Sequence, residues 1–161
     1  MPKRRPLDSL EGAYDAAIKM LARKSRTTQE VRDDLLEHGA SEPDVESVLA
    51  RLKANRVLDD AVLATDDAFS LVESKGVAPA LAVYKLTSRG VAPSIAQDAV
   101  DAAREDRSDL ELCAEALSRR LKTGRLDVED VPKQGRWLAR LGYDEDVVAR
   151  VLDQALRGSG E

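Results

Sequence analysis

Histidine and cysteine are common nucleophiles, bases and metal ligands, and this chain has only one of each. One imidazole and one thiol cannot complete a zinc site, which almost always takes four ligands. His38 stands just before Gly39 at an expected helix end, where positive charge complements the helix dipole. Cys113 lies among Ala and Leu, as a small buried hydrophobe does. No Gly-x-x-x-x-Gly-Lys-Ser/Thr phosphate loop occurs, so we expect no enzymatic activity, no cofactor and no metal.

Adjacent carboxylates occur three times and could be taken for cation sites. They are Asp33-Asp34, Asp59-Asp60 and Asp66-Asp67. Side chains of consecutive helical residues diverge by about 100°, so the two members of a pair do not converge on one ion. Asp59 or Asp60 stands at an expected helix start, where a carboxylate accepts hydrogen bonds from free backbone N–H groups. We therefore predict helix capping there rather than ion binding.

Basic residues gather at two places, which could contact an acidic partner or a phosphate. One cluster is Arg23-Lys24-Ser25-Arg26, and the other is Arg119-Arg120-Leu121-Lys122 with Arg125. Both stand at expected helix C-termini, where positive charge is stabilising in itself, so solvated helix ends are the simpler interpretation. Residues 1–8 are basic, and we interpret them as a flexible tail or as an arm that contacts phosphate. The spacing of Trp137, the only tryptophan, favours a position in the core over a role as an interface anchor.

We expect helices to position these side chains. A short sequence pattern that occurs three times predicts where some of those helices end. Leu35–Gly39, Leu86–Gly90 and Leu138–Gly142 each place a leucine one helical turn before a glycine, and the glycines lie about 51 residues apart. Glycine closes a helix there because it reaches the left-handed backbone conformation without strain. After each glycine, apolar residues follow at i, i+3, i+4 and i+7, which predicts a helix with one apolar stripe. We infer three copies of one helical unit.

Start and stop signals divide each copy into a long, a short and a medium helix. Capping boxes are expected at Asp8–Glu11, Thr27–Glu30 and Ser108–Glu111. No segment shows the alternation of a strand. The sequence predicts an all-α protein of about nine helices, a tandem repeat of three three-helix units that forms an elongated, curved molecule. The expected divisions are a flexible basic tail at 1–8, units at 9–56, 57–106 and 107–157, and a tail at 158–161.

Composition and charge fit a row of thin helical units. Hydrophobic residues make up 43% of the chain but aromatic ones only 3%, so the expected cores consist of Ala, Val and Leu. The net charge of −5 and a pI of about 5.1 argue against a protein whose main work is wrapping nucleic acid. No apolar stretch approaches the roughly 20 residues that cross a membrane, and the single cysteine cannot form an internal disulfide. We expect a cytoplasmic monomer without membrane contact.

Four sequence pieces resemble, in the right order, the signatures of the RecX regulatory proteins. Arg26-Thr-Thr-Gln-Glu30-Val31, with Leu35 and Gly39, resembles the first-repeat pattern Arg-Ser-x-x-Glu-Leu with a later Leu and Gly. Leu58-Asp59-Asp60 resembles the opening of the second repeat, and Pro79, Leu86, Arg89, Gly90 and Val91 resemble its Pro…Leu-x-x-Lys-Gly-Ile. Gly142-Tyr143 is similar to the Gly-Phe of the third repeat. The resemblance spans about residues 14–156 and implies tandem three-helix units.

The resemblance implies a binding protein. RecX proteins bind the RecA recombinase filament on single-stranded DNA, lodge in its groove, inhibit strand exchange and ATPase activity, and promote filament disassembly. The implied role is regulation of RecA in DNA repair and the SOS response. A curved row of repeats offers an extended concave face on which many modest contacts can add up. The candidate contacts are basic residues near helix ends of the first two units, which we expect on one face: Arg23, Lys24, Arg26, Lys75, Lys85 and Arg89.

The alternative is a protein that binds DNA directly with helix-turn-helix-like short helices, including a transcriptional repressor. The acidic pI and the scarcity of basic residues on any single helix disfavour that alternative. Weak direct contact with DNA beside the filament stays open. Binding to naked DNA should fall steeply with salt for a true DNA-binding protein, which separates the two hypotheses.

Overall fold

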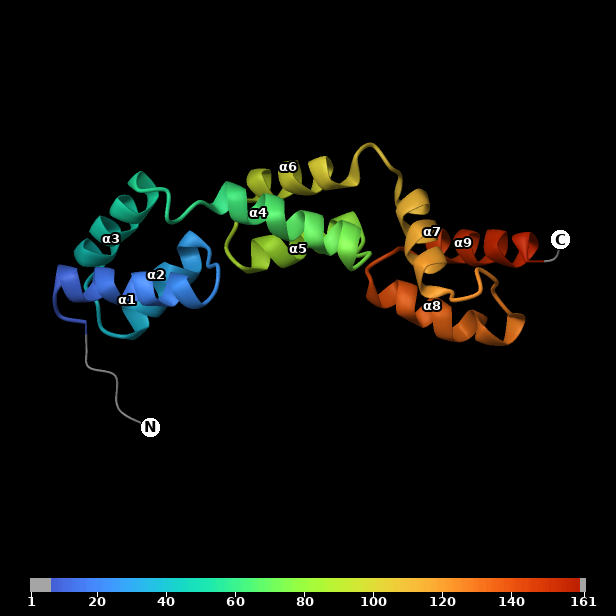
Figure 1. The fold of residues 1–161 in the computed structure, drawn as a ribbon, viewed down its shortest axis with the longest axis horizontal. Coiled ribbons are helices and arrows are strands. Elements are labelled where there is room, and N and C mark those ends of the chain that lie inside the picture. The colour runs from blue at the N-terminus through green and yellow to red at the C-terminus, as the bar shows by residue number, and fades with distance from the viewer. Residues whose placement is uncertain (1–6, 160–161) are drawn as a thin grey trace.

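The computed structural model describes residues 7–159, and its helices follow one another in a bowed row (Figure 1). In chain order the elements are α1 (Leu10–Arg23), α2 (Thr28–Glu37), α3 (Glu42–Ala54), α4 (Asp60–Phe69), the π-helix η1 (Ser70–Ser74), α5 (Pro79–Ser88), α6 (Pro93–Arg104), α7 (Asp109–Arg120), the 3-10 helix η2 (Val128–Asp130), α8 (Val131–Arg140) and α9 (Glu145–Gly158). No strand occurs between residues 7 and 159, so the predicted all-α fold is confirmed. Residues 1–6 and 160–161, where most of the two predicted tails fall, lie outside the described range.

Successive helices pack in triplets, which Figure 1 shows as three small bundles side by side. We call α1–α3 unit 1, α4–α6 with η1 unit 2, and α7–α9 with η2 unit 3. The predicted divisions at 9–56, 57–106 and 107–157 serve as working boundaries and remain our proposal. The elements η1 and η2 had no counterpart among the expected helices. Helix α9 continues through Gly158, one residue into the segment predicted as a tail.

Local capping chemistry explains where most helices begin. Both hydrogen bonds of a capping box are present at Thr27 with Glu30 and at Ser108 with Glu111, as predicted. The box expected at Asp8 is wrong, because Ser9 is the N-cap of α1 and accepts a hydrogen bond from the Gly12 N–H at 3.0 Å. Each cap satisfies an N–H group that a helix start leaves without an intrahelical acceptor.

The three repeated glycines occupy equivalent corners, each after the second helix of a unit. Gly39, Gly90 and Gly142 have φ values of 93°, 92° and 97°, which confirms the predicted left-handed conformation. In every corner the carbonyl just before the glycine accepts a hydrogen bond from the preceding part of the chain. The three bonds are Leu7 N–H to His38 O at 3.1 Å, Thr27 Oγ1–H to Arg89 O at 2.6 Å, and Ala78 N–H to Leu141 O at 2.8 Å. Successive units are therefore joined corner to helix start, and Leu7 takes the place of a preceding unit.

The two junctions between units differ in what is buried there. Unit 1 has its own cluster of buried apolar residues, whereas one continuous cluster runs through units 2 and 3. Tyr143, which is only 5% exposed, belongs to that shared cluster, and its hydroxyl donates to the Gly76 carbonyl of unit 2 at 3.1 Å. Units 2 and 3 are thus held by a common core, and unit 1 must be held to unit 2 by other means.

Replacing Gly142 by alanine should cost more stability than replacing Gly124. Both residues have positive φ, 97° and 70°, so alanine at either position loses about 1–2 kcal/mol of backbone energy. A Cβ on Gly142 would lie 2.6 Å from the Cβ of Leu81 in unit 2, whereas nothing lies within 4 Å of a Cβ on Gly124. Urea unfolding should show a loss for Gly142→Ala at least about 1 kcal/mol larger than for Gly124→Ala. Equal losses would contradict tight packing in the corner.

The thiol of Cys113 should stay unreactive in the folded protein. Cys113 is 0% exposed, as expected of a small buried hydrophobe, and burial together with the negative charge of Asp109 raises its pKa to about 12. The reactive thiolate is therefore scarce at neutral pH. Labelling by a thiol-specific reagent at pH 8 should be negligible until urea unfolds the chain, and rapid labelling in buffer would contradict the burial.

Candidate partner-binding surface

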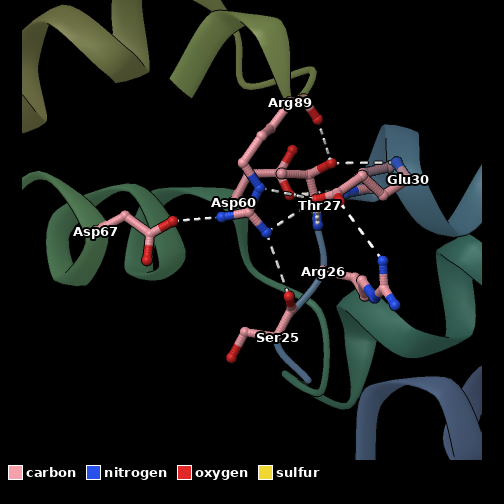
Figure 2. A network of polar contacts seen from close by, with 8 residues as sticks. Ser25, Arg26, Thr27, Glu30, Asp60, Asp67 and Arg89 are labelled. Atoms are coloured by element: carbon pink, nitrogen blue, oxygen red, sulfur yellow. Dashed lines mark hydrogen bonds and ion pairs between the residues drawn. The ribbon is translucent and has the colours of Figure 1, made fainter. Parts of the chain in front are cut away.

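Two of the six residues predicted to contact a partner meet at the junction of units 1 and 2. Arg26 lies between α1 and α2, and its Nη1 is 3.8 Å from the Oε2 of Glu30. Arg89, the C-cap residue of α5, donates from Nε and Nη2 to the other oxygen of Glu30 at 3.1 and 2.9 Å. Two guanidinium groups from different units therefore share one carboxylate (Figure 2). Nε of Arg26 is buried and has no hydrogen-bond partner within the described residues.

Arg89 uses its whole side chain to hold the junction (Figure 2). Besides Glu30, it donates to the carbonyl of Ser25 in unit 1 at 3.2 Å and pairs with Asp67 on α4 of its own unit. Its side chain is 28% exposed, so these charge-assisted bonds are partly shielded from water. This geometry orders the two units relative to each other and leaves Arg89 little freedom to reach a partner.

Threonines at the start of α2 add a second set of contacts across the same junction. The fully buried Thr27 hydroxyl donates to Arg89 O and accepts the Glu30 N–H, so both its functions are satisfied. Thr28 donates through its backbone N–H at 2.8 Å and through its hydroxyl at 3.1 Å to one oxygen of Asp60, the first residue of α4. Unit 2 thus helps to cap a helix of unit 1.

Glu30 is contacted by Arg26, Arg89 and Thr27, and these contacts bear on the pKa of its carboxyl group. Burial alone would raise the pKa of this carboxyl group. The hydrogen bond from the Thr27 backbone N–H and the charge and hydrogen bonds of Arg89 outweigh burial, so the pKa lies below its ordinary value of 4.5. The junction is therefore built for an ionised Glu30.

Three other predicted contact residues are exposed. Arg23 is in the last turn of α1 and Lys24 is its C-cap residue, while Lys85 is in the last turn of α5. Near the end of α1, a cleft of about 770 Å³ opens between unit 1 and unit 2, and Arg26 lies on its wall. Val57 and Val62, which also line this cleft, are 44% and 56% exposed. Cations and exposed apolar side chains therefore adjoin each other on this part of the surface.

Lys75 lies apart from the others. It is the C-cap residue of η1 and lies beside residues of unit 3, whereas Arg89 lies beside residues of unit 1. Helix α5, whose 10 residues span about 15 Å, separates the two positions. Lys75 shares a depression with Arg119 and Arg120 of unit 3. The structure therefore brings Arg26 and Arg89 together but does not gather all six residues in one place.

Sequence reasoning missed the acidic side of the junction. It assigned Glu30 to a capping box and the Asp59-Asp60 pair to capping the helix that follows, which are local roles. Asp59 does cap α4, accepting from the Ala61 and Val62 N–H groups, but Asp60 binds Thr28 from 32 residues away. No local spacing signals such a contact, although the opposite charges of Arg89 and Asp67 offered a weak hint.

Within residues 7–159, no three His, Cys, Asp or Glu side chains lie close enough together to hold a metal ion. No helix of that part of the chain is long and apolar enough to cross a membrane.

Glu30→Gln should destabilise the protein at neutral pH and do so less as the pH falls. A pKa lowered on folding means that ionised Glu30 stabilises the fold fully above about pH 4.5, and this contribution is lost as the pH falls through the lowered pKa. Thermal unfolding at pH 7 should show a loss of about 1–2 kcal/mol relative to the native chain. The difference should shrink as the pH falls below about 4.5. Glu37→Gln, at the exposed end of α2, should show no such convergence.

Comparison with known proteins places the chain by similarity. The family described as RecX, first three-helix domain, matches residues 13–52. The regulatory protein RecX of Leptothrix cholodnii is 31% identical over 152 residues, a match that covers 94% of this chain and 92% of that protein. The RecX of Geobacillus thermodenitrificans is 28% identical over 151 residues and 90% of this chain, which spans only 54% of that longer relative.

Solved structures agree in fold. The crystal structure of RecX from Lactobacillus salivarius superposes with a TM-score of 0.69 at 20% identity, covering 92% of this chain and 96% of that one. A second crystal structure of regulatory protein RecX gives a TM-score of 0.62 at 21% identity over 89% of this chain and 71% of that one. The similarity to the Leptothrix protein along nearly the whole chain shows that the chain belongs to the RecX family of regulatory proteins.

Proposed function

We propose that this protein binds the RecA recombinase filament on single-stranded DNA and inhibits its recombinase and ATPase activities, without catalysing a reaction itself. The observation that carries the proposal is membership of a family of regulatory proteins along nearly the whole chain. The setting of such a function is DNA repair and the SOS response in the cytoplasm. The partner comes from what the family resemblance implies.

The shape of the molecule supports binding to something larger than itself. Three bundles in a bowed row present a long surface, and modest contacts from several bundles act together when all can be engaged at once (Figure 1). A filament of identical protomers offers matching contacts at repeated intervals. A protein built from repeated units is suited to such a partner.

The surface around the end of α1 is the best candidate for the first contacts. Arg23 and Lys24 are exposed, and Val57 and Val62 expose apolar surface in the adjoining cleft. Interfaces combine an apolar centre with a polar rim, and arginine is enriched in them. Arg26 and Arg89 act differently in this proposal, because they hold unit 1 in place and thereby position this surface.

Reversing the charge of Arg23 and Lys24 should weaken binding to the filament. Both side chains are exposed and neither forms an ion pair within the described residues, so Arg23→Glu with Lys24→Glu should leave the fold intact. We expect at least about a tenfold loss of affinity, or about 1.4 kcal/mol, in co-sedimentation with RecA filaments and in inhibition of RecA ATPase. The matched control reverses Lys53 and Arg150, which are exposed on α3 and α9.

Sedimentation of the native chain also distinguishes binding to the RecA filament from direct binding to DNA. Co-sedimentation with RecA on single-stranded DNA at low salt, exceeding that with the DNA alone, is the expected result. If the native chain fails to sediment with filaments, RecA is not the partner. If it binds naked double-stranded DNA equally well and with a steep salt dependence, the protein is a DNA-binding protein instead.

A further inference from the structure

Units 2 and 3 border a small basic depression that lies apart from the proposed contact surface at Arg23 and Lys24, although Lys75 in its lining is one of the six candidate contacts. It has a volume of about 290 Å³ and lies where the end of η1 meets α7 and α8. Its charged and aromatic lining is Lys75 from unit 2 and Arg119, Arg120 and Trp137 from unit 3. Four side chains from three separate stretches of sequence therefore converge on one place.

The backbone at this place is held firmly. Gly76, which lines the depression, has a φ of 68°, and its carbonyl accepts the Tyr143 hydroxyl inside the core that units 2 and 3 share. Arg119 donates to the carbonyl of Glu73, the second-last residue of η1. The last turn of α7 is thereby fastened to the end of η1, and the depression does not depend on mobile loops.

The positive charge of the depression is not neutralised within the described part of the chain. No carboxylate lies within 4.0 Å of the charged nitrogens of Lys75, Arg119 or Arg120 there, although ten other such pairs occur. The nearest acid along the chain, Glu73, is paired with Arg107. An acidic protein thus maintains a local excess of cations at one fixed point, where an anion would be attracted.

Trp137 gives the depression a second property. The guanidinium carbon of Arg120 lies 4.3 Å from the centroid of the Trp137 ring, and the ring is only partly buried against the shared core. Proteins that bind single-stranded nucleic acid combine cations that meet backbone phosphates with aromatic rings on which bases stack. Because Arg120 already lies over the Trp137 ring, a base would stack on the guanidinium plane of Arg120 or on the exposed part of the ring. An acidic protein surface would use the positive charges but would make neither stacking contact.

We propose that this depression binds single-stranded nucleic acid, with backbone phosphates at Lys75, Arg119 and Arg120 and a base beside Trp137. The site would let unit 3 touch the DNA strand while unit 1 contacts protein, which deepens the proposed function because a RecA filament carries single-stranded DNA. The test nevertheless uses the chain alone with naked oligonucleotide. A failure here leaves binding to RecA intact, and a failure to bind RecA leaves this site intact.

The experiment titrates a labelled deoxythymidine oligonucleotide with the full chain at several salt concentrations and follows fluorescence anisotropy. The variant Lys75→Ala/Arg119→Ala/Arg120→Ala should lose at least about tenfold in affinity at low salt. If three phosphate contacts vanish, the slope of log affinity against log salt should become less steep by about 2, at about 0.7 per phosphate. The matched control Lys53→Ala/Arg140→Ala/Arg150→Ala removes the same charge from exposed helix positions and should retain most of the native affinity and slope.

A further variant distinguishes loss of the site from loss of the fold. Further ligands distinguish nucleic acid from other anions. Arg119→Lys/Arg120→Lys keeps the charge but removes the guanidinium contacts with Glu73 and Trp137, so retained binding would show that loss of those contacts does not by itself destroy the site. Trp137, as the only tryptophan, should change its fluorescence when oligonucleotide binds. Equal losses in the alanine variant and its control would overturn the site. Polyglutamate or inorganic phosphate binding to this depression as tightly as the oligonucleotide would overturn its assignment to nucleic acid.

Discussion

A helix end leaves backbone carbonyls without intrahelical donors, and this molecule satisfies one of them from outside the unit each time its repeated corner occurs. The glycine at the corner makes this possible. It turns the chain through a left-handed conformation and leaves room for the neighbouring helix start, where the Cβ of Leu81 or Gln29 would otherwise collide. The common feature of the corners is thus a carbonyl that accepts a hydrogen bond from outside the unit. The donor is a side-chain hydroxyl at one corner and an N–H group at the other two, and the remaining side chains at each junction differ as well.

They do differ, and the difference divides the molecule's properties. Unit 1 meets unit 2 through Arg89, Glu30, Asp67 and the threonines of α2, so that junction weakens when Glu30 is protonated. Units 2 and 3 meet through a continuous apolar core in which Tyr143 is buried and the pKa of its hydroxyl is raised by that burial. The position of unit 1 against unit 2 therefore depends on ionised side chains, whereas units 2 and 3 share one apolar core. The basic depression lies where units 2 and 3 meet.

Local signals made most of the fold predictable. The glycines at 39, 90 and 142 and the capping box at Thr27 act within a few residues, so their spacing alone placed the helices. The π-helical turn η1 was missed because no residue type marks it. The candidate site was harder, since Asp60 and Arg89 act across 32 and 59 residues and no spacing rule reaches that far. Lys75 and Arg89 lie at opposite ends of α5, and their shared contact with a partner remains a prediction.

The bond from Leu7 to the His38 carbonyl has a consequence for assembly. Identical units that join corner to helix start could in principle continue from one molecule to the next, as open head-to-tail polymers do. A single stretch of main chain occupies the acceptor through which another copy would attach. The acceptor that receives a neighbouring unit at the second and third corners is therefore already engaged at the first corner, by Leu7 of the same chain.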